Sequence, residues 1–177
     1  MSLHVSHVLL TEETIRERVQ ELGREISRDY AGCELLLVGI LKGAFIFLAD
    51  LARCLTVPVW VDFMAAASYG DSYRSSGEAL ILRNLEKDIR NLHVLLVEDI
   101  IDTGLTIQCI RETLQKRGPA SLKICALLDK PGRRLVEIKP DYKGFTIPDE
   151  FVVGYGLDFR DNYRCLKDIM VLRQEAR

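Results

Sequence analysis

VLLVEDIIDTGLT, residues 94–106, joins a short apolar run to two acids and then to a Thr-Gly loop. The run Val94–Val97 is typical of a strand buried on both faces of a sheet, and it ends in the two acids. The pattern from Leu105 to Arg117 predicts a helix, which Gly118-Pro119 would end. A strand that feeds a helix through a short loop is the building unit of an α/β fold with a parallel sheet. This stretch therefore predicts the fold class and the position of a ligand loop.

The same alternation of strands and helices extends to both sides of this stretch. Helices are predicted at residues 11–30, with Thr11 as the N-cap, and at residues 44–55. Further strands are predicted at residues 35–40, 57–67, 79–83, 122–128, 151–155 and 169–172. Right-handed crossovers place the ligand loops of a parallel sheet at the C-terminal ends of its strands. The loops after Ile40, Val97 and Leu128 are therefore expected to share one crevice.

Composition indicates one globular domain and excludes several classes of partner. The chain has 177 residues, of which 48% are hydrophobic and 28% charged, as is ordinary for one domain with a sizeable core. Its net charge of −2 and pI near 6.0 give no basic field for nucleic acid or an anionic membrane. No apolar run approaches the ~18 to 20 residues that span a bilayer, and no export signal begins the chain. We expect a cytoplasmic protein.

The cysteines indicate a reducing compartment. They are odd in number, lack any CxxC spacing and mostly lie in apolar stretches: Cys33, Cys54, Cys109, Cys125 and Cys165. Reduced, buried thiols explain this usage better than disulfides or metal ligands.

The acids and the Thr-Gly loop together predict a ligand that carries phosphate, hydroxyl groups and a metal ion. Backbone N–H groups of such a loop and helix start form an anion site, to which the Thr103 and Thr106 hydroxyls add donors. Glu98 and Asp99 would repel a bare anion. Phosphoribosyl pyrophosphate offers a ribose diol to carboxylates and brings Mg²⁺ with its pyrophosphate. Solvated acids beside an ordinary helix cap would explain one acid, but they explain the whole set poorly.

VEDIIDTGLT resembles the phosphoribosyl pyrophosphate signature of type I phosphoribosyltransferases, specifically of the hypoxanthine-guanine branch. GILKGAFIFLADL, SYG, LLDKP and IPDEFVVGYGLDFRDNYRCL follow in the family's order, over nearly the whole chain. The resemblance implies a purine salvage enzyme that uses Mg²⁺, converts hypoxanthine or guanine to IMP or GMP, and releases pyrophosphate. It also implies a homodimer or homotetramer. The single domain of residues 1–177 would carry a small base-binding hood, formed by the N-terminal segment and residues from about 140 to 177.

The resemblance assigns residues to phosphoribosyl pyrophosphate. Glu98 and Asp99 would bind the ribose diol, and the 5′-phosphate would be held by Asp102, Thr103, Gly104, Leu105 and Thr106. Lys42 and Gly43 resemble the pyrophosphate loop, in which the peptide bond between Leu41 and Lys42 is often cis. Ser68 and Tyr69 begin the polar segment SYGDSYRSSG. This segment resembles the family's mobile cover over the pyrophosphate, and Arg164 resembles its pyrophosphate-binding arginine.

The base and the metal ion have their own candidates. Lys130 follows a predicted strand, and its ammonium can only donate, so it would bind O6 of hypoxanthine or guanine and reject the donor of adenine. By resemblance, Phe151 would stack on the purine and Val152 would contact the base edge. Asp158 would bind Mg²⁺ beside the base, with Glu98 and Asp99 as further metal ligands. Asp102 would be the catalytic residue, acting at the purine N7.

Two departures from the family and three alternatives remain open. Leu105 stands where some relatives carry a basic residue, and Asp129-Lys130-Pro131 replaces a more basic stretch. A uracil phosphoribosyltransferase or its RNA-binding regulatory relative would share the signature, although the acidic pI does not support an RNA-binding face. A module that only senses phosphoribosyl pyrophosphate is disfavoured, because it has no need of Asp102, Lys42, Tyr69 and Arg164 together. No GxGxxG or Walker loop supports dinucleotide or P-loop binding.

Overall fold

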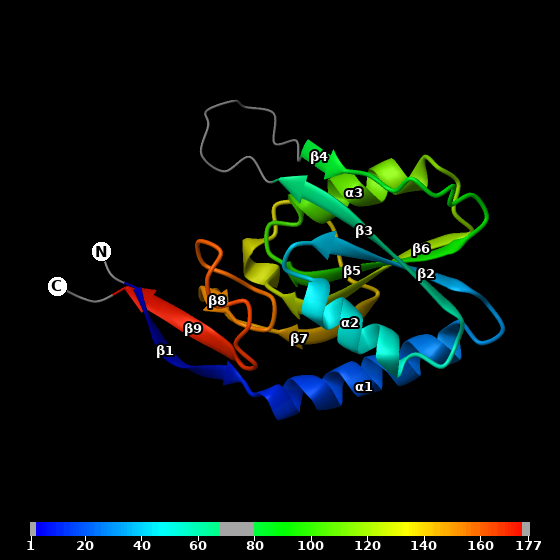
Figure 1. Ribbon diagram of the computed structural model, residues 1–177. Coiled ribbons are helices and arrows are strands. Elements are labelled where there is room, and N and C mark those ends of the chain that lie inside the picture. The colour runs from blue at the N-terminus through cyan, green and yellow to red at the C-terminus, as the bar shows by residue number, and fades with distance from the viewer. Residues whose placement is uncertain (1–2, 68–79, 175–177) are drawn as a thin grey trace.

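A six-stranded sheet in the order β4-β3-β2-β5-β6-β7 forms the centre of the computed structural model, which describes residues 3–67 and 80–174 (Figure 1). Its strands are β2 (Leu35–Leu41), β3 (Val59–Ala67), β4 (Leu80–Arg83), β5 (His93–Ile101), β6 (Ser121–Asp129) and β7 (Tyr142–Thr146). All neighbours pair in parallel except β4, which runs antiparallel to β3 at one edge. The predicted α/β fold with a largely parallel sheet is confirmed.

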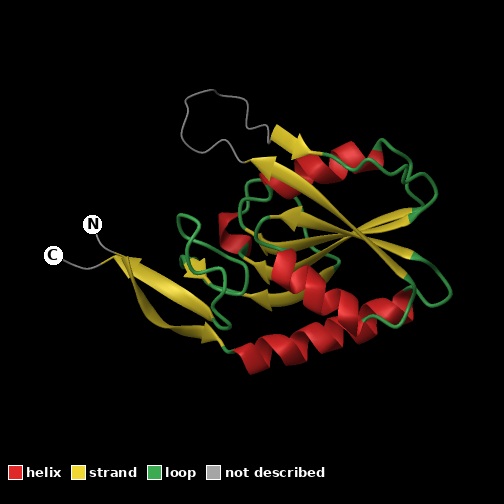
Figure 2. Ribbon diagram, in the orientation of Figure 1, coloured by secondary structure: helices red, strands yellow, loops and turns green. Residues whose placement is uncertain are grey.

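Helices cover both faces of this sheet (Figure 2). α1 (Glu12–Asp29) and α2 (Phe45–Cys54) pack on one face, and α3 (Leu105–Gln115) packs on the other; a short 3₁₀ helix, η1, spans Pro131–Arg133. Leu35 and Leu37 of β2 belong to the core on the α1 and α2 side, whereas Leu36 and Val38 belong to the core on the α3 side. Alternate residues of one strand thus fill two cores. This explains why the strand sequences are continuously apolar.

The start of α1 follows the capping rule that the sequence suggested. Thr11 is the N-cap of α1, and its hydroxyl oxygen accepts a hydrogen bond from the Thr14 N–H at 3.3 Å. Glu12 and Glu13 occupy the first turn, where the helix dipole favours acids. The predicted helices therefore agree with α1, α2 and α3 to within one or two residues.

A second, antiparallel sheet joins the two ends of the described chain. Its order is β1-β9-β8, with β1 at Leu3–Leu10, β8 at Val152–Val153 and β9 at Ile169–Gln174. Neither β1 nor β7 was predicted. β7 pairs with β6 in the main sheet and is not part of the small sheet. The C-terminal residues of the small sheet therefore begin at Val152 rather than near residue 140.

β5 is longer than the predicted strand. Pairing with β6 continues through Glu98, Ile100 and Ile101, so the two acids lie inside the strand instead of following it. Successive side chains of a strand point to opposite faces. Glu98 and Asp99 consequently face different hollows of the molecule.

None of the five cysteines forms a disulfide. Only Cys125 is buried, whereas Cys165 is exposed and the other three are half-buried, so the prediction of buried thiols is right for Cys125 alone. In the described part of the chain, no helix combines the length and the apolar character that crossing a bilayer requires.

Candidate active site

The chain changes direction between β2 and β5. From β2 it continues to β3 on one side, and β5 then pairs with the other side of β2. Ligands of open α/β sheets bind at such a switch point, beyond the C-terminal ends of the strands. A cleft of about 760 Å³ opens there. Its lining includes Lys42, Gly43, Asp99, Asp102, Lys130, Phe151, Val152, Asp158 and Arg164, so the three predicted loops do share one crevice.

Gly43 and Asp99 touch where β2 and β5 end. A Cβ atom at residue 43 would lie 1.6 Å from Asp99 Oδ2, so only glycine leaves room for the carboxylate. The other oxygen of Asp99 accepts a hydrogen bond from the Ile100 N–H at 2.8 Å. The peptide bond between Leu41 and Lys42 is cis, as the family resemblance implied. The loop after β2 is thus packed directly against an acid of β5.

The two acids of β5 are electrostatically unusual. Burial, followed by the neighbouring charge of Asp99, raises the pKa of Glu98 well above its ordinary value. Glu98 Oε2 is shielded from solvent and has no hydrogen-bond partner. Burial also raises the pKa of Asp99 to about 6, against the lowering effects of its backbone hydrogen bonds and of Arg164. Such a pair favours a ligand that brings hydroxyl donors or a cation.

A smaller hollow of about 240 Å³ lies at the start of α3 and is lined by Glu98, Asp102, Thr103, Gly104 and Thr106, among others. The N-cap residue of α3, Gly104, makes no side-chain cap bond, although the Leu105 N–H donates to the Thr103 hydroxyl at 3.5 Å. The remaining N–H groups of the first turn are suited to an anion. Leu105 begins α3 but does not line this hollow. The predicted phosphate-binding residues therefore come together, apart from the Leu105 side chain.

Asp102 belongs to both hollows and is engaged by an arginine that sequence reasoning missed. Arg133 Nε lies 3.1 Å from Asp102 Oδ1, and Arg133 Nη1 lies 3.3 Å from Asp149 Oδ1. Arg134 Nη1 donates to the Asp102 carbonyl oxygen at 3.1 Å. The sequence signal was present, since two arginines follow LLDKPG at the end of a strand. Asp102 Oδ1 is shielded from solvent and, besides this ion pair, has no hydrogen-bond partner.

The base-facing candidates lie between β6 and β8. Lys130 is buried, and its ammonium donates to the Glu150 carbonyl oxygen at 2.6 Å, which leaves two N–H donors for a ligand. Phe151 is 51% exposed and packs edge-on against Phe159, with ring centroids 5.7 Å apart. Val152 is buried in β8. An exposed aromatic face beside a buried lysine suits a flat heterocycle with an acceptor oxygen.

Arg164 and Lys42 supply positive charge to the same cleft. Arg164 Nη2 pairs with Asp158 Oδ1 at 2.7 Å, and Arg164 Nη1 donates to the Gly156 carbonyl oxygen at 2.7 Å. Lys42 Nζ donates to Asp161 Oδ1 at 3.0 Å. Asp161 was not predicted, because nothing local in the sequence distinguishes it. The remaining candidates, Ser68 and Tyr69, and the segment 68–77 lie outside the described residues.

Comparison with known proteins agrees with this geometry. Residues 9–160 match the phosphoribosyl transferase domain, and the chain belongs to the phosphoribosyltransferase family. It is 50% identical over 165 residues to the hypoxanthine phosphoribosyltransferase of Salmonella typhimurium, covering 92% of this chain and 93% of that protein. It is 47% identical over 172 residues to the hypoxanthine-guanine phosphoribosyltransferase of Streptococcus pneumoniae, covering 97% and 96%. The Bacillus anthracis hypoxanthine-guanine phosphoribosyltransferase structure superposes with a TM-score of 0.91 at 39% identity, covering 98% and 100%. Its place in the hypoxanthine-guanine branch, indicated by the motifs, is confirmed.

Proposed function

We propose that the chain transfers the 5-phosphoribosyl group of phosphoribosyl pyrophosphate to hypoxanthine or guanine, as a purine salvage enzyme. The bond between C1′ and the pyrophosphate oxygen breaks, and a bond between C1′ and N9 of the base forms. One observation carries the proposal. A single cleft joins Asp99 of β5, the Lys42-Gly43 loop and the buried Lys130 at the switch point of the sheet.

The first substrate would occupy both hollows. The N–H groups and hydroxyls from Thr103 to Thr106 suit the 5′-phosphate, and Glu98 and Asp99 suit the ribose diol. Lys42 and Arg164 supply charge for the pyrophosphate. Asp102 connects the two hollows, so a ligand held in both must pass beside it.

The base would lie between Phe151 and Lys130. Phe151 supplies an exposed face for stacking and Val152 the neighbouring backbone, while the Lys130 ammonium donates to O6. Asp102 would take the proton that the base loses at N7 as N9 attacks, or stabilise the positive charge that develops. Arg133 forms an ion pair with Asp102, whose carboxylate lines the cleft.

The donor set fits Mg²⁺ when substrate oxygens complete the coordination. Across residues 3–67 and 80–174, no three metal-binding side chains form a ready-made site. Mg²⁺ typically uses only one or two carboxylates together with phosphate oxygens and water. Glu98, Asp99 and Asp158 would hold it, and the unpartnered Glu98 Oε2 is consistent with this. When bound, the ion would neutralise the charge of the departing pyrophosphate.

We further propose that residues 1–177 act as one domain with a base-binding hood, in a cytoplasmic homodimer or homotetramer. Sedimentation velocity of the purified enzyme distinguishes the two assemblies from a monomer.

The direct test is turnover with phosphoribosyl pyrophosphate, Mg²⁺ and each of hypoxanthine, guanine, xanthine, adenine and uracil. We expect hypoxanthine or guanine to be the best substrate and adenine and uracil to be rejected. Preference for uracil would instead support the pyrimidine alternative. Tight binding of phosphoribosyl pyrophosphate without turnover of any base would support a sensing module.

A further inference from the structure

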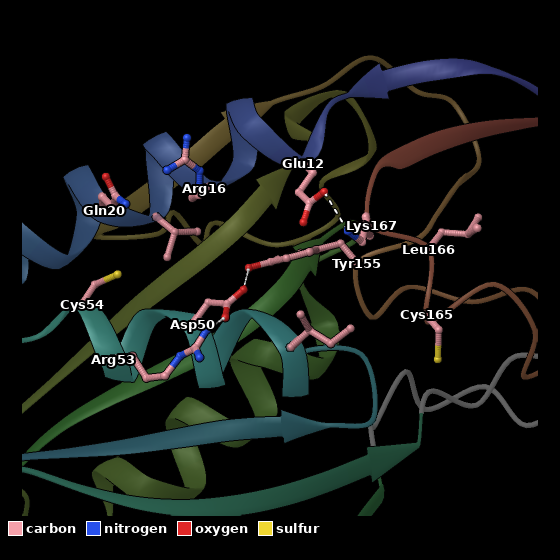
Figure 3. Close-up of a pocket in the computed structure, with 12 residues that line it drawn as sticks. Glu12, Arg16, Gln20, Asp50, Arg53, Cys54, Tyr155, Cys165, Leu166 and Lys167 are labelled. Carbon is pink, nitrogen blue, oxygen red and sulfur yellow. Dashed lines mark hydrogen bonds and ion pairs between the residues drawn. The ribbon is translucent and has the colours of Figure 1, made fainter.

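Tyr155 connects the C-terminal segment to the helix that follows the pyrophosphate loop. Its hydroxyl donates to Asp50 Oδ2 at 2.6 Å, and its side chain reaches across to α2 (Figure 3). The other oxygen of Asp50 accepts from Arg53 at 2.5 Å. Tyr155 is buried, and burial together with the Asp50 carboxylate raises the pKa of its hydroxyl far above the ordinary value. The hydroxyl therefore remains a donor at neutral pH.

The backbone at Tyr155 forms an unusual turn. Gly154, Tyr155 and Gly156 have φ values of +99°, +49° and +101°, and a tyrosine in this left-handed region is unfavourable unless tertiary contacts hold it. Backbone hydrogen bonds contribute, from Tyr155 N–H to the Leu166 carbonyl at 2.8 Å, from Gly156 N–H to the Arg164 carbonyl at 2.9 Å, and in both directions between Gly154 and Leu157 at 3.0 Å. The Tyr155 side chain adds its bond to Asp50.

This turn packs against the Lys42-Gly43 loop, which is proposed above to bind pyrophosphate. A Cβ atom at Gly156 would lie 2.1 Å from the Gly43 carbonyl oxygen, so the two backbones are in close contact. The Gly156 carbonyl also accepts the hydrogen bond from Arg164, which pairs with Asp158. A shift of the turn would therefore move Gly43 and Arg164 relative to each other.

The base-facing wall is held by other means. β8 pairs with β9 through Val152 and Val171, and the Leu172 N–H donates to the Phe151 carbonyl at 2.8 Å. Asp50 and Tyr155 line a separate cavity of about 570 Å³ between α1, α2 and residues 165–167 (Figure 3). The pair thus lies behind the active-site cleft and outside its lining.

We propose that Tyr155 and Asp50 form a positioning pair that fixes the Gly154–Gly156 turn against Gly43 and thereby tunes the binding of pyrophosphate. Neither residue lines the active-site cleft. The inference rests on the pyrophosphate-binding roles proposed above for Lys42 and Arg164. It predicts a selective defect, because the turn contacts the pyrophosphate loop whereas β9 holds the base wall.

The test is steady-state kinetics of Tyr155→Phe in both directions. Losing a hydrogen bond to a charged group should raise KM roughly tenfold for phosphoribosyl pyrophosphate, and equally for pyrophosphate in the reverse reaction. KM for hypoxanthine and for IMP should stay within about twofold, the scatter expected between uncoupled sites. Asp50→Ala should reproduce these changes, and Asp50→Asn, whose amide oxygen still accepts, should be milder. The double variant Tyr155→Phe with Asp50→Ala should be no worse than either single one.

Tyr142→Phe is the matched control. Tyr142 is also buried, and its hydroxyl donates to Asp29 Oδ2 at 2.8 Å, between β7 and α1. It should lower the melting temperature about as much as Tyr155→Phe while leaving every KM unchanged. A rise in KM for pyrophosphate of the same size in Tyr142→Phe would overturn the positioning role, since the effect would then be a general loss of stability.

The variant Lys42→Ala distinguishes a failure of the positioning pair from a failure of the proposed function. If Lys42→Ala raises KM for pyrophosphate but Tyr155→Phe and Asp50→Ala do not, the positioning pair is refuted and the proposed function stands. If none of the three changes that KM, the assignment of this side of the cleft to pyrophosphate is wrong, and the inference fails with it.

Discussion

The acidic end of β5 and the segment Phe151–Arg164 form two sides of one cleft, but they are held in different ways. β5 lies in the middle of the sheet, paired with β2 on one side and β6 on the other. The C-terminal segment has only the two-residue strand β8, and its non-glycine residues at positive φ are Tyr155, Arg160, Asp161 and Tyr163. Regular pairing fixes the carboxylates that we propose bind the ribose. The C-terminal side combines the short pairing of β8 with β9 at the proposed base site with side-chain bonds of Tyr155 and Arg164, so single substitutions can adjust the groups proposed to bind pyrophosphate.

The two sides also differ in charge. The β5 side presents Glu98 and Asp99, whose raised pKa values reflect burial without sufficient compensation. The opposite side carries Arg164, which pairs with Asp158 and opposes the rise in the pKa of Asp99, and Lys130 lies between the two sides. A ligand with hydroxyls at one end and a pyrophosphate at the other complements this arrangement. A simple phosphate anion does not.

The largest expected effect is on base selectivity, at the boundary between the two sides. In Lys130→Gln, the new amide can still donate to the Glu150 carbonyl oxygen but can also accept from the exocyclic amine of adenine. A site that bonds one polar group discriminates by roughly 10⁴-fold, so much of the preference for hypoxanthine over adenine should be lost. Competition between the two bases measures this, with Lys167→Gln, a substitution of an exposed lysine paired with Glu12, as control. Unaltered selectivity would remove Lys130 from the base site.

The second largest effect is expected on kcat, when Asp102 at the end of the β5 side is substituted. Asp102→Asn keeps size and hydrogen bonding but removes the charge, so kcat should fall by roughly 10²- to 10⁴-fold, the usual contribution of a positioned acid or base. Binding of phosphoribosyl pyrophosphate should barely change. Asp149→Asn is the control, because Asp149 shares Arg133 with Asp102 and should leave kcat nearly normal. A stable Asp102→Asn enzyme with nearly normal kcat would leave Asp102 only a structural role.

The same difference explains how much the sequence could predict. The β5 side is contiguous, so residues 94–106 show the strand, the acids and the helix start in one stretch. The length of β5 was underestimated because Glu98 and Asp99 are charged and have little intrinsic preference for a strand. Pairing with β6 nevertheless extends β5 to Ile101.

The C-terminal side depends on contacts between distant residues. The bond from Lys42 to Asp161 and the bond from Tyr155 to Asp50 each join residues more than 100 positions apart in the sequence, which no local pattern relates. Family resemblance supplied Asp158 and Arg164. It did not supply Asp161 or Arg133, whose roles appear only when the loops meet.

Calorimetry with ribose 5-phosphate and with pyrophosphate tests most directly whether the β5 side binds the sugar and the C-terminal side binds the pyrophosphate. With Mg²⁺ present, Asp99→Asn should weaken ribose 5-phosphate binding about tenfold, and Arg164→Gln should weaken pyrophosphate binding about tenfold, as expected for lost charged hydrogen bonds. Arg164→Gln should leave ribose 5-phosphate affinity within about twofold of the wild type, because Arg164 bonds to Gly156, Asp158 and Asp161 and not to Asp99. The account is contradicted if Arg164→Gln weakens both fragments equally, or if Asp99→Asn leaves ribose 5-phosphate binding unchanged.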